Sequence, residues 1–359
     1  MASESVGVLN RVMVDRRSFR GAFMDLVAAI AATGPWKGLA ERLVRAVGHA
    51  FPNSWVVVSV CRHFGRQLFK REGTQFERVV TFDSGGQMLC CGTGRVAEAS
   101  VMYYFLGTIT NQDEDERPLA QLLTRAVRTG DTFLDIGANV GFYSFFVGPL
   151  CGLSGAVHAF EANPLLIQHL QRSAALNKTR ANIVVNPVAV GRESNKTLQL
   201  FDPDRIGGSS LYQLDWLDTA RSVTVPLTTI DDYVRKNRLE RIDVVKIDIE
   251  GAELDAFRGM QDTFTLCPPS VILCELALLL GAGNDPGSSL GSRERGGYAM
   301  EVMHFLAARG YQARSIRAED GLIADVIEPE TMGRLTQNLI NVAFVRNELK
   351  AQRPELFCR

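Results

Sequence analysis

Three charged residues interrupt one apolar stretch of the chain. The segment VVKIDIEGAELDAFRG, residues 244–259, carries Lys246, Asp248 and Glu250 among β-branched residues. Side chains two residues apart on a strand share one face, and a buried charge without a partner is costly. Such charges could perform acid–base chemistry, with Asp248 as the general base and Lys246 or Glu250 adjusting its pKa. A ladder of ion pairs, with Lys246 between two carboxylates, would explain the same pattern without catalysis.

Binding of a divalent cation is another possible use of these carboxylates. Asp248, Glu250 and Glu275 could together hold an ion that orients and acidifies a substrate oxygen. Because a number of carboxylates alone does not define a site, we predict no bound metal. Cys90 and Cys91 lack a second cysteine or histidine pair at zinc-ligand spacing, so they do not predict a zinc site.

A glycine-rich turn follows a predicted strand at residues 132–136. In GDTFLDIGANVGFYS, Asp135 ends that strand, and Gly137 and Gly141 follow it. Glycine permits a tight turn and lets a ligand approach the backbone. The spacing G-x-x-x-G, unlike G-x-G-x-x-G, disfavours a dinucleotide and favours a ligand without phosphates. A turn that only joins strand to helix is the alternative.

An acid ends the next predicted strand. The strand AVHAF, residues 156–160, is followed by Glu161 and then by Asn163-Pro164, which opens a helix. A carboxylate at this place can accept both hydroxyl groups of a ribose. Alone, Glu161 could equally be a helix-start charge. Together with the glycine turn, it favours a nucleoside ligand.

A parallel α/β sheet is the element that would position these residues. The alternation of strand, glycine turn, helix and strand after Gly130 is typical of such folds. Core strands are predicted over residues 132–136, 156–160, 183–185, 244–249, 271–275, 312–316 and 339–345. An inserted pair of short strands is predicted at residues 197–201 and 223–227.

The chain is predicted to have an N-terminal accessory or cap region over residues 1–115, helical at first and then built of short strands. A core domain over residues 116–350 and a C-terminal tail over residues 351–359 complete it. The glycine- and serine-rich stretch 281–297 has the composition of a mobile loop. The accessory region and this loop are expected to shape a substrate pocket, although neither carries a motif that names the substrate.

Composition excludes some classes of protein. The 359 residues include 39 basic and 40 acidic ones, so net charge gives no reason to expect a nucleic-acid partner. The seven scattered cysteines suit reduced thiols. Asp25 argues against a signal peptide, and no apolar run approaches the roughly 20 residues that span a bilayer. We therefore predict a cytoplasmic protein without membrane insertion.

The motifs DIGANVGFYS, FEANP, NPVAVG, GGSSL and VKIDIEGAELDAFRG together resemble the FkbM family of S-adenosylmethionine (SAM)-dependent methyltransferases. The resemblance covers about residues 115–346. It implies a Rossmann-like class I methyltransferase fold, with a mostly parallel seven-stranded sheet whose last strand, NLINVAFVR, is antiparallel. It also implies SAM as cofactor and O-methylation of a sugar, polyketide or other secondary metabolite.

The resemblance also assigns residues to parts of the cofactor. The glycine turn would line its methionine part, Glu161 would bind the ribose, and adenine would lie near the helix start at Asn163 and the turn of residues 186–189. Many class I enzymes place an acid after the third strand for the adenine amino group, but Ala189 stands near that place here. Backbone or Asn186 would serve instead. The residues that the resemblance thus implies for cofactor binding are Asp135, Gly137, Ala138, Asn139, Gly141, Glu161, Asn163, Asn186, Ala189 and Asp248.

Two other functions remain open on the sequence. An NAD(P)-dependent oxidoreductase would use the same sheet and ribose acid, although the missing G-x-G-x-x-G counts against it. A non-catalytic SAM-binding protein would keep the fold without turnover. The acceptor is expected to be a hydroxyl of a small molecule or glycan, and neither its identity nor the oligomeric state is predicted.

Overall fold

The computed structural model describes residues 37–50, 61, 77–91, 104, 116–203, 209–211, 221–277, 296–334 and 339–358. The predicted helices before residue 37, the strand WVVVSV and most of the 281–297 loop lie outside these ranges. The chain divides into two compact units, residues 1–78 with 90–115, and residues 79–89 with 116–359. Residues 79–89, which the sequence analysis placed in the N-terminal region, thus belong to the second unit.

Within the first unit, helix α3 (Lys37–Ala50) carries a buried acid. The Glu41 carboxylate accepts hydrogen bonds from Arg78 Nε at 2.6 Å and from the Tyr104 hydroxyl at 2.8 Å. In the second unit, the turn of a hairpin of β1 (Glu77–Thr81) and β2 (Gln87–Cys91) packs on the core domain. There, the Leu89 amide donates to Ser173 Oγ at 3.0 Å.

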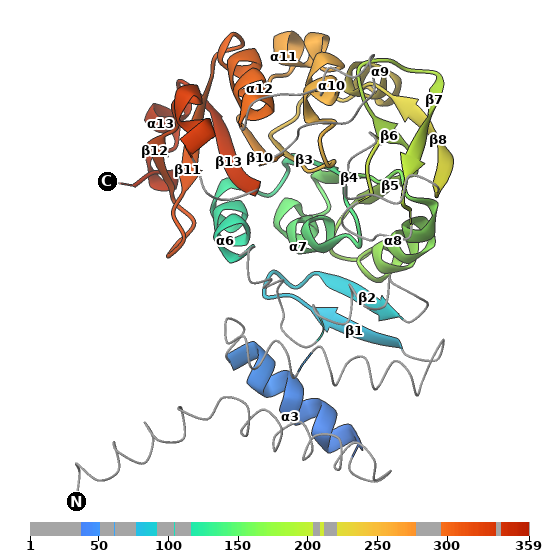
Figure 1. Cartoon of the computed structure of the whole chain (residues 1–359). Coiled ribbons are helices and arrows are strands. Elements are labelled where there is room, and N and C mark those ends of the chain that lie inside the picture. The colour runs from blue at the N-terminus through green and yellow to red at the C-terminus, as the bar shows by residue number, and fades with distance from the viewer. Residues whose placement is uncertain are drawn as a thin grey trace, which may run out of the picture. The chain divides into compact units, whose positions relative to one another are not determined.

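An eight-stranded sheet forms the centre of the second unit (Figure 1). Its spatial order is β12-β11-β13-β10-β9-β3-β4-β5. The strands are β3 (Thr132–Ile136), β4 (Ala156–Phe160), β5 (Ile183–Asn186), β9 (Val244–Ile247), β10 (Val271–Ala277), β11 (Tyr311–Ile316), β12 (Ile323–Val326) and β13 (Leu339–Arg346). Strands β10, β9, β3, β4 and β5 pair in parallel.

The last strand, β13, runs antiparallel to both of its neighbours, β10 and β11. This arrangement confirms the predicted Rossmann-like α/β fold with an antiparallel final strand. One feature was not predicted: β12 adds an eighth strand, antiparallel to β11 at the sheet edge. Its sequence IADV is short and only partly buried, so it lacks the apolar run that marks a core strand.

Helices cover both faces of the sheet, as Figure 1 shows. On one face lie α6 (Arg117–Ala126), α7 (Phe142–Cys151) and α8 (Pro164–Leu176). On the other lie α9 (Ile230–Asn237), α10 (Glu253–Arg258), α11 (Gln261–Leu266) and α12 (Gly297–Ala307). Covering both faces explains why the central strands read as continuous apolar runs.

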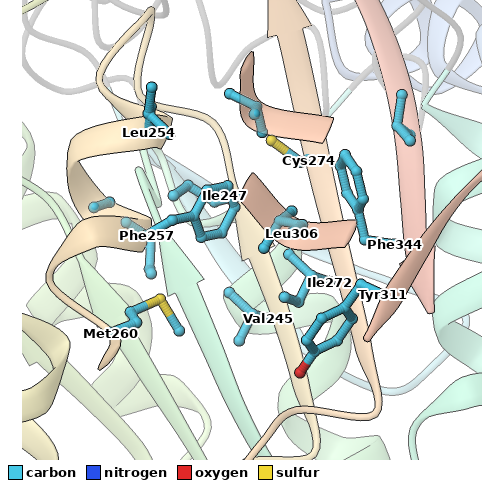
Figure 2. Packing of buried hydrophobic residues seen from close by; sticks show 14 of the residues in the cluster. Val245, Ile247, Leu254, Phe257, Met260, Ile272, Cys274, Leu306, Tyr311 and Phe344 are labelled. Atoms are coloured by element: carbon cyan, nitrogen blue, oxygen red, sulfur yellow. The ribbon is translucent and has the colours of Figure 1, made fainter. Parts of the chain in front are cut away.

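The largest core lies between the sheet and helices α9–α12. Phe257 of α10 and Leu306 of α12 pack against Val245, Ile247 and Ile272 of the central strands (Figure 2). All five side chains are fully buried. Burial of each such side chain contributes about 1.5–3 kcal/mol. This core holds β9 and β10 in place, and with them the turn that follows β9.

A small sheet of β6 (Ala189–Val190), β8 (Ser222–Thr228) and β7 (Lys196–Phe201) contains the predicted inserted pair of strands. The chain ends in η3 (Pro329–Arg334), β13, α13 (Leu349–Gln352) and η4 (Pro354–Leu356). The segment predicted as a tail packs on the domain: Phe357 is buried and bridges to Ile323 of β12. None of the helices in the described ranges has the length and apolar character needed to cross a membrane.

Candidate cofactor and catalytic site

The strand order reverses beside β3. From β3 the chain continues to β4 and β5 on one side, and it later returns to β9 on the other side. Ligands of open α/β sheets bind at such a reversal, beyond the carboxyl ends of the strands. Asp135 lies at the end of β3, Glu161 follows β4 and Asp248 follows β9. The fold therefore gathers the three predicted acids at one edge of the sheet.

The first glycine of the turn is required by a close backbone approach. Gly137 has a φ of 85°, and a Cβ atom there would lie 1.8 Å from the carbonyl oxygen of Asp248. The amides of Gly137 and Ala138 donate to the carbonyl of Phe160 at 3.0 and 2.9 Å. The turn is thereby fastened to the ends of both neighbouring strands, β9 and β4.

The second glycine of the turn serves helix packing. Gly141 has a φ of 89° and is the N-cap of α7. An added Cβ would lie 2.2 Å from the ring of Phe145 and 2.7 Å from the side chain of Leu170. Gly141 thus lets α7 and α8 pack together at the site, as a small residue must where two helices meet closely.

Glu161 joins the glycine turn to the start of α8. Its carboxylate accepts hydrogen bonds from the Asn139 amide at 2.7 Å and from the Asn163 amide at 2.8 Å. Asn139 has a φ of 52°, a conformation that this hydrogen bond helps to hold. Burial raises the pKa of Glu161, while the two amides oppose that rise. Each carboxylate oxygen has a further lone pair with which to accept from a ligand.

Two buried oxygen atoms at this edge have no hydrogen-bond donor within the described part of the chain. They are Oδ1 of Asp135 and Oδ1 of Asn139. The other oxygen of Asp135 accepts from the Ser144 hydroxyl at 2.5 Å. Burial raises the pKa of Asp135, and nearby Lys246 lowers it. Buried acceptors without donors suit a ligand that brings its own donors and positive charge, as SAM does with its ammonium group and ribose hydroxyls.

Lys246 and Asp248 form a partly buried ion pair on the α7 side of the sheet. Lys246 Nζ lies 3.0 Å from Asp248 Oδ2 and 5.1 Å from the centre of the Tyr143 ring. Lys246 pairs in register with Asp135 of β3. Burial alone would lower the pKa of Lys246, but Asp248 and Asp135 raise it above its ordinary value. Lys246 therefore stays an ammonium group and cannot itself be the base.

Glu250 does not share a strand face with the other two charges, contrary to the sequence prediction. β9 ends at Ile247, two residues earlier than predicted, and Glu250 lies in a turn with a φ of 52°. The alternative metal site of Asp248, Glu250 and Glu275 is not assembled either, because no group of three potential metal-ligating side chains is found in the described ranges. The charged cluster that forms instead contains Lys246, Asp248 and Asp135.

The residues predicted near adenine have structural contacts of their own. Asn163 caps α8, with its Oδ1 accepting from the Leu165 amide at 3.0 Å and its Nδ2 donating to the Pro203 carbonyl at 2.6 Å. Asn186 Nδ2 donates to the carbonyls of Ala159 and Val184 at 3.2 and 3.3 Å. Ala189 is buried in the small sheet. Asn163 follows core strand β4 and Asn186 ends core strand β5, whereas Ala189 lies outside the core sheet. Contact of these three residues with adenine stays a prediction.

Glu253 was not among the predicted site residues, yet it contacts the turn after β9. Its buried carboxylate accepts from the amides of Ile249 and Gly251 at 3.0 and 3.2 Å. It also accepts from the Tyr298 hydroxyl at 2.7 Å. An acid at the start of a helix, just after a glycine turn, is the signal that could have found it.

A methyltransferase FkbM domain matches residues 135–313 of this chain. The chain is 28% identical over 171 residues to the hexuronic acid methyltransferase AglP of Haloferax volcanii, covering 48% of this chain and 64% of that protein. It is 24% identical over 163 residues to the 31-O-demethyl-FK506 methyltransferase FkbM of Streptomyces tacrolimicus, covering 38% and 62%. The match thus spans less than two thirds of the length of either relative.

Among solved structures, a putative rRNA methylase of Clostridium thermocellum aligns with 66% of this chain and 97% of its own. The identity is 12% and the TM-score 0.38, too low to add to the argument from strand order. The family match confirms the predicted resemblance and, with it, SAM as the cofactor. On the motifs, the strand order and this match together, residues 135–313 form a domain of the FkbM family of SAM-dependent methyltransferases.

Proposed function

We propose that this protein transfers the methyl group of SAM to a hydroxyl group of a sugar or another small metabolite. The observation that carries the proposal is the Lys246–Asp248 pair at the end of β9, directly beside the glycine turn of β3. The name of one relative, a 31-O-demethyl-FK506 methyltransferase, supports an oxygen acceptor, and that of another, a hexuronic acid methyltransferase, supports a sugar derivative as substrate.

In this proposal Asp135 and Asn139 hold the methionine part of the cofactor, and Glu161 accepts from its ribose hydroxyls. SAM, when bound, supplies a methyl group that reacts with a nucleophilic oxygen. Methyl transfer of this kind depends mostly on positioning, since the protein need only align the acceptor and remove one proton. The glycine turn and the end of β9 provide two rigid walls for that alignment.

Asp248 is the proposed general base, and the acceptor hydroxyl would donate its proton to this carboxylate. The side chain of Asp248 is 31% exposed, whereas that of Lys246 is 7% exposed. Asp248 can therefore reach a ligand from the open edge, and Lys246 holds it from inside the sheet. The ion pair with Lys246 fixes the position of this carboxylate beside the glycine turn.

The test is methyl transfer from radiolabelled SAM to a panel of glucuronic acid, galacturonic acid, neutral hexoses and a hydroxylated polyketide. We expect a methyl ether on at least one acceptor, identified by mass spectrometry. Binding of S-adenosylhomocysteine (SAH), the demethylated product, is measured by calorimetry on the same protein. Tight SAH binding without transfer to any hydroxyl would contradict O-methylation and leave a non-catalytic SAM-binding protein. Absence of SAH binding would contradict the cofactor site itself.

A further inference from the structure

The turn between β9 and α10, residues 249–251, has an unusual backbone. Glu250 has a φ of 52° and Gly251 a φ of 99°, so two consecutive residues lie in the left-handed region. A residue such as glutamate keeps this conformation only where its surroundings fix it. Because the turn follows Asp248 directly, its shape affects the direction in which the side chain of the proposed base points.

Glu253 supplies most of the contacts that fix this turn. Its Oε1 accepts from the amides of Ile249 and Gly251, one on each side of Glu250. Its Oε2 accepts from the Tyr298 hydroxyl, whose oxygen accepts in turn from the Leu254 amide at 3.1 Å. Glu253 is 2% exposed, and none of these three donors carries a charge. Because a carboxylate is costly to bury among neutral groups, its presence here indicates that the turn needs this side chain to keep its shape.

The carbonyl group of the same turn is held from another direction. Ser210 Oγ donates to the carbonyl oxygen of Glu250 at 2.7 Å. Ser210 is 1% exposed and is itself fixed by β7, because its carbonyl accepts from the Phe201 amide at 2.8 Å. One polar backbone group of each of the three residues 249–251 is thus bound by a buried side chain.

Asp248 is held on its other side by β3. Its amide donates to the carbonyl of Ile136 at 3.0 Å, and its own carbonyl lies against Gly137. The peptide that carries the proposed base is therefore fixed between β3 and the turn that Glu253 holds. We propose that Glu253 is a positioning residue, which fixes the turn after β9 and thereby aims Asp248 at the acceptor. This inference rests on the proposed function, in which Asp248 accepts the proton.

Asp231 offers a matched control elsewhere in the fold. Its carboxylate also accepts from two backbone amides and one hydroxyl: the amides of Asp262 and Thr263 at 3.0 and 2.8 Å, and the Thr263 hydroxyl at 2.7 Å. It holds the start of α11 and has no part in the proposed mechanism. Replacement of Asp231 by alanine therefore shows the effect of losing the same kind of side-chain-to-backbone hydrogen bonds away from the site.

The experiment compares the full chain with Glu253→Ala, Glu253→Gln, Ser210→Ala and Asp231→Ala. Three quantities are measured: kcat and KM with the panel acceptor that the wild type methylates fastest, SAH affinity, and amide hydrogen exchange of the turn 249–251. In Glu253→Ala we expect kcat to fall about 100-fold, because small misplacements of reacting groups have effects of that size. SAH affinity and the KM for SAM should stay within about threefold, since other loops bind the cofactor.

Glu253→Gln should recover most of the rate, because its amide oxygen can still accept from both turn amides. Asp231→Ala should lower thermal stability without lowering kcat. Equal losses of kcat in Glu253→Ala and Asp231→Ala, or a Gln variant as slow as the Ala variant, would overturn the proposal. If Glu253→Ala does not fold, Ser210→Ala must lower kcat more than Asp231→Ala does.

Hydrogen exchange separates failure of this inference from failure of the proposed function. The amides of Ile249 and Gly251 should exchange faster in Glu253→Ala and stay protected in Glu253→Gln. Unchanged protection in Glu253→Ala would overturn the positioning role whatever the activity. Loss of protection in a protein whose wild type methylates no acceptor would support the hold of Glu253 on the turn and contradict the function proposed for Asp248.

Discussion

Gly137 packs so closely against the carbonyl oxygen of Asp248 that position 137 has no room for a side chain. A Cβ atom on Gly137 would lie 1.8 Å from the Asp248 oxygen. This contact joins the glycine turn after β3 to the proposed base after β9. The two halves of the site therefore touch at this point, and a side chain at position 137 is expected to displace both.

Gly137→Ala should disrupt both stability and cofactor binding. The positive φ alone costs an alanine about 1–2 kcal/mol, and the clash with Asp248 forces the two loops apart. We expect a total loss of about 3 kcal/mol or more in unfolding free energy, and SAH affinity weaker by at least about tenfold. Denaturant unfolding and calorimetry measure these two effects.

Gly310→Ala is the matched control for that experiment. Gly310 has a φ of 83°, and an added Cβ would meet nothing within 4 Å. It should therefore show only the conformational cost, about 1–2 kcal/mol, with unchanged SAH affinity. If Gly137→Ala behaved like Gly310→Ala in both measurements, the close packing of the two loops would have no functional weight.

Glu161→Gln should weaken cofactor binding. A hydrogen bond to a charged acceptor contributes about 1.5–3 kcal/mol, so we expect SAH affinity to fall about 10- to 100-fold. Glu193→Gln serves as control, since Glu193 is exposed and paired with Lys196. Calorimetric titration with SAH is the measurement. An unchanged dissociation constant in Glu161→Gln would show that this carboxylate only braces Asn139 and Asn163.

Asp248→Asn should lower kcat by about 10²- to 10⁴-fold, the usual contribution of a general base. SAH affinity should change little, because the asparagine keeps an acceptor for Lys246. Asp255→Asn is the control, since this acid lies in the same motif and pairs with Arg258 at 3.1 Å. Steady-state rates with the acceptor found in the panel test the prediction. Full activity in Asp248→Asn would assign proton removal to solvent or to another group.

His158 should make the fold sensitive to acid. Burial lowers the pKa of His158 from 6.5 to about 4, and its Nδ1 bonds the Tyr233 hydroxyl at 2.8 Å. Because the folded pKa lies below the unfolded one, the stability contribution is complete above pH 6.5. It is lost as the pH falls from 6.5 towards 4. The difference corresponds to about 3 kcal/mol.

His158→Gln should remove this component, since glutamine can still bond to Tyr233 but does not titrate. The measurement is the free energy of unfolding of both proteins at a series of pH values from 7 down to 4. Their difference should shrink on acidification, whatever the other titrating groups contribute to each curve. A difference that is constant with pH would mean that His158 is protonated equally in the folded and unfolded chain.

The sequence determined the parts of this protein that depend on local pattern. Strands β3 and β4 begin and end where the alternation of apolar runs and turns predicted, because each is a short buried run bounded by glycine or by an acid. The sequence also placed Asp135, Glu161 and Asp248 at one edge of the sheet, because parallel strands bring their carboxyl ends to a common edge. The FkbM motifs in the sequence also indicated SAM as the cofactor.

Only the tertiary structure decided which charges meet. The spacing of Lys246, Asp248 and Glu250 suggested one strand face, but the chain turns after Ile247 and Glu250 takes a left-handed conformation. Lys246 instead lies beside both Asp248, its near neighbour in the sequence, and Asp135, which stands on the adjacent strand β3. Glu253 binds the amides of the turn directly, and it is itself held by the hydroxyl of Tyr298, 45 residues away. Such contacts depend on how distant segments pack, and no local periodicity records them.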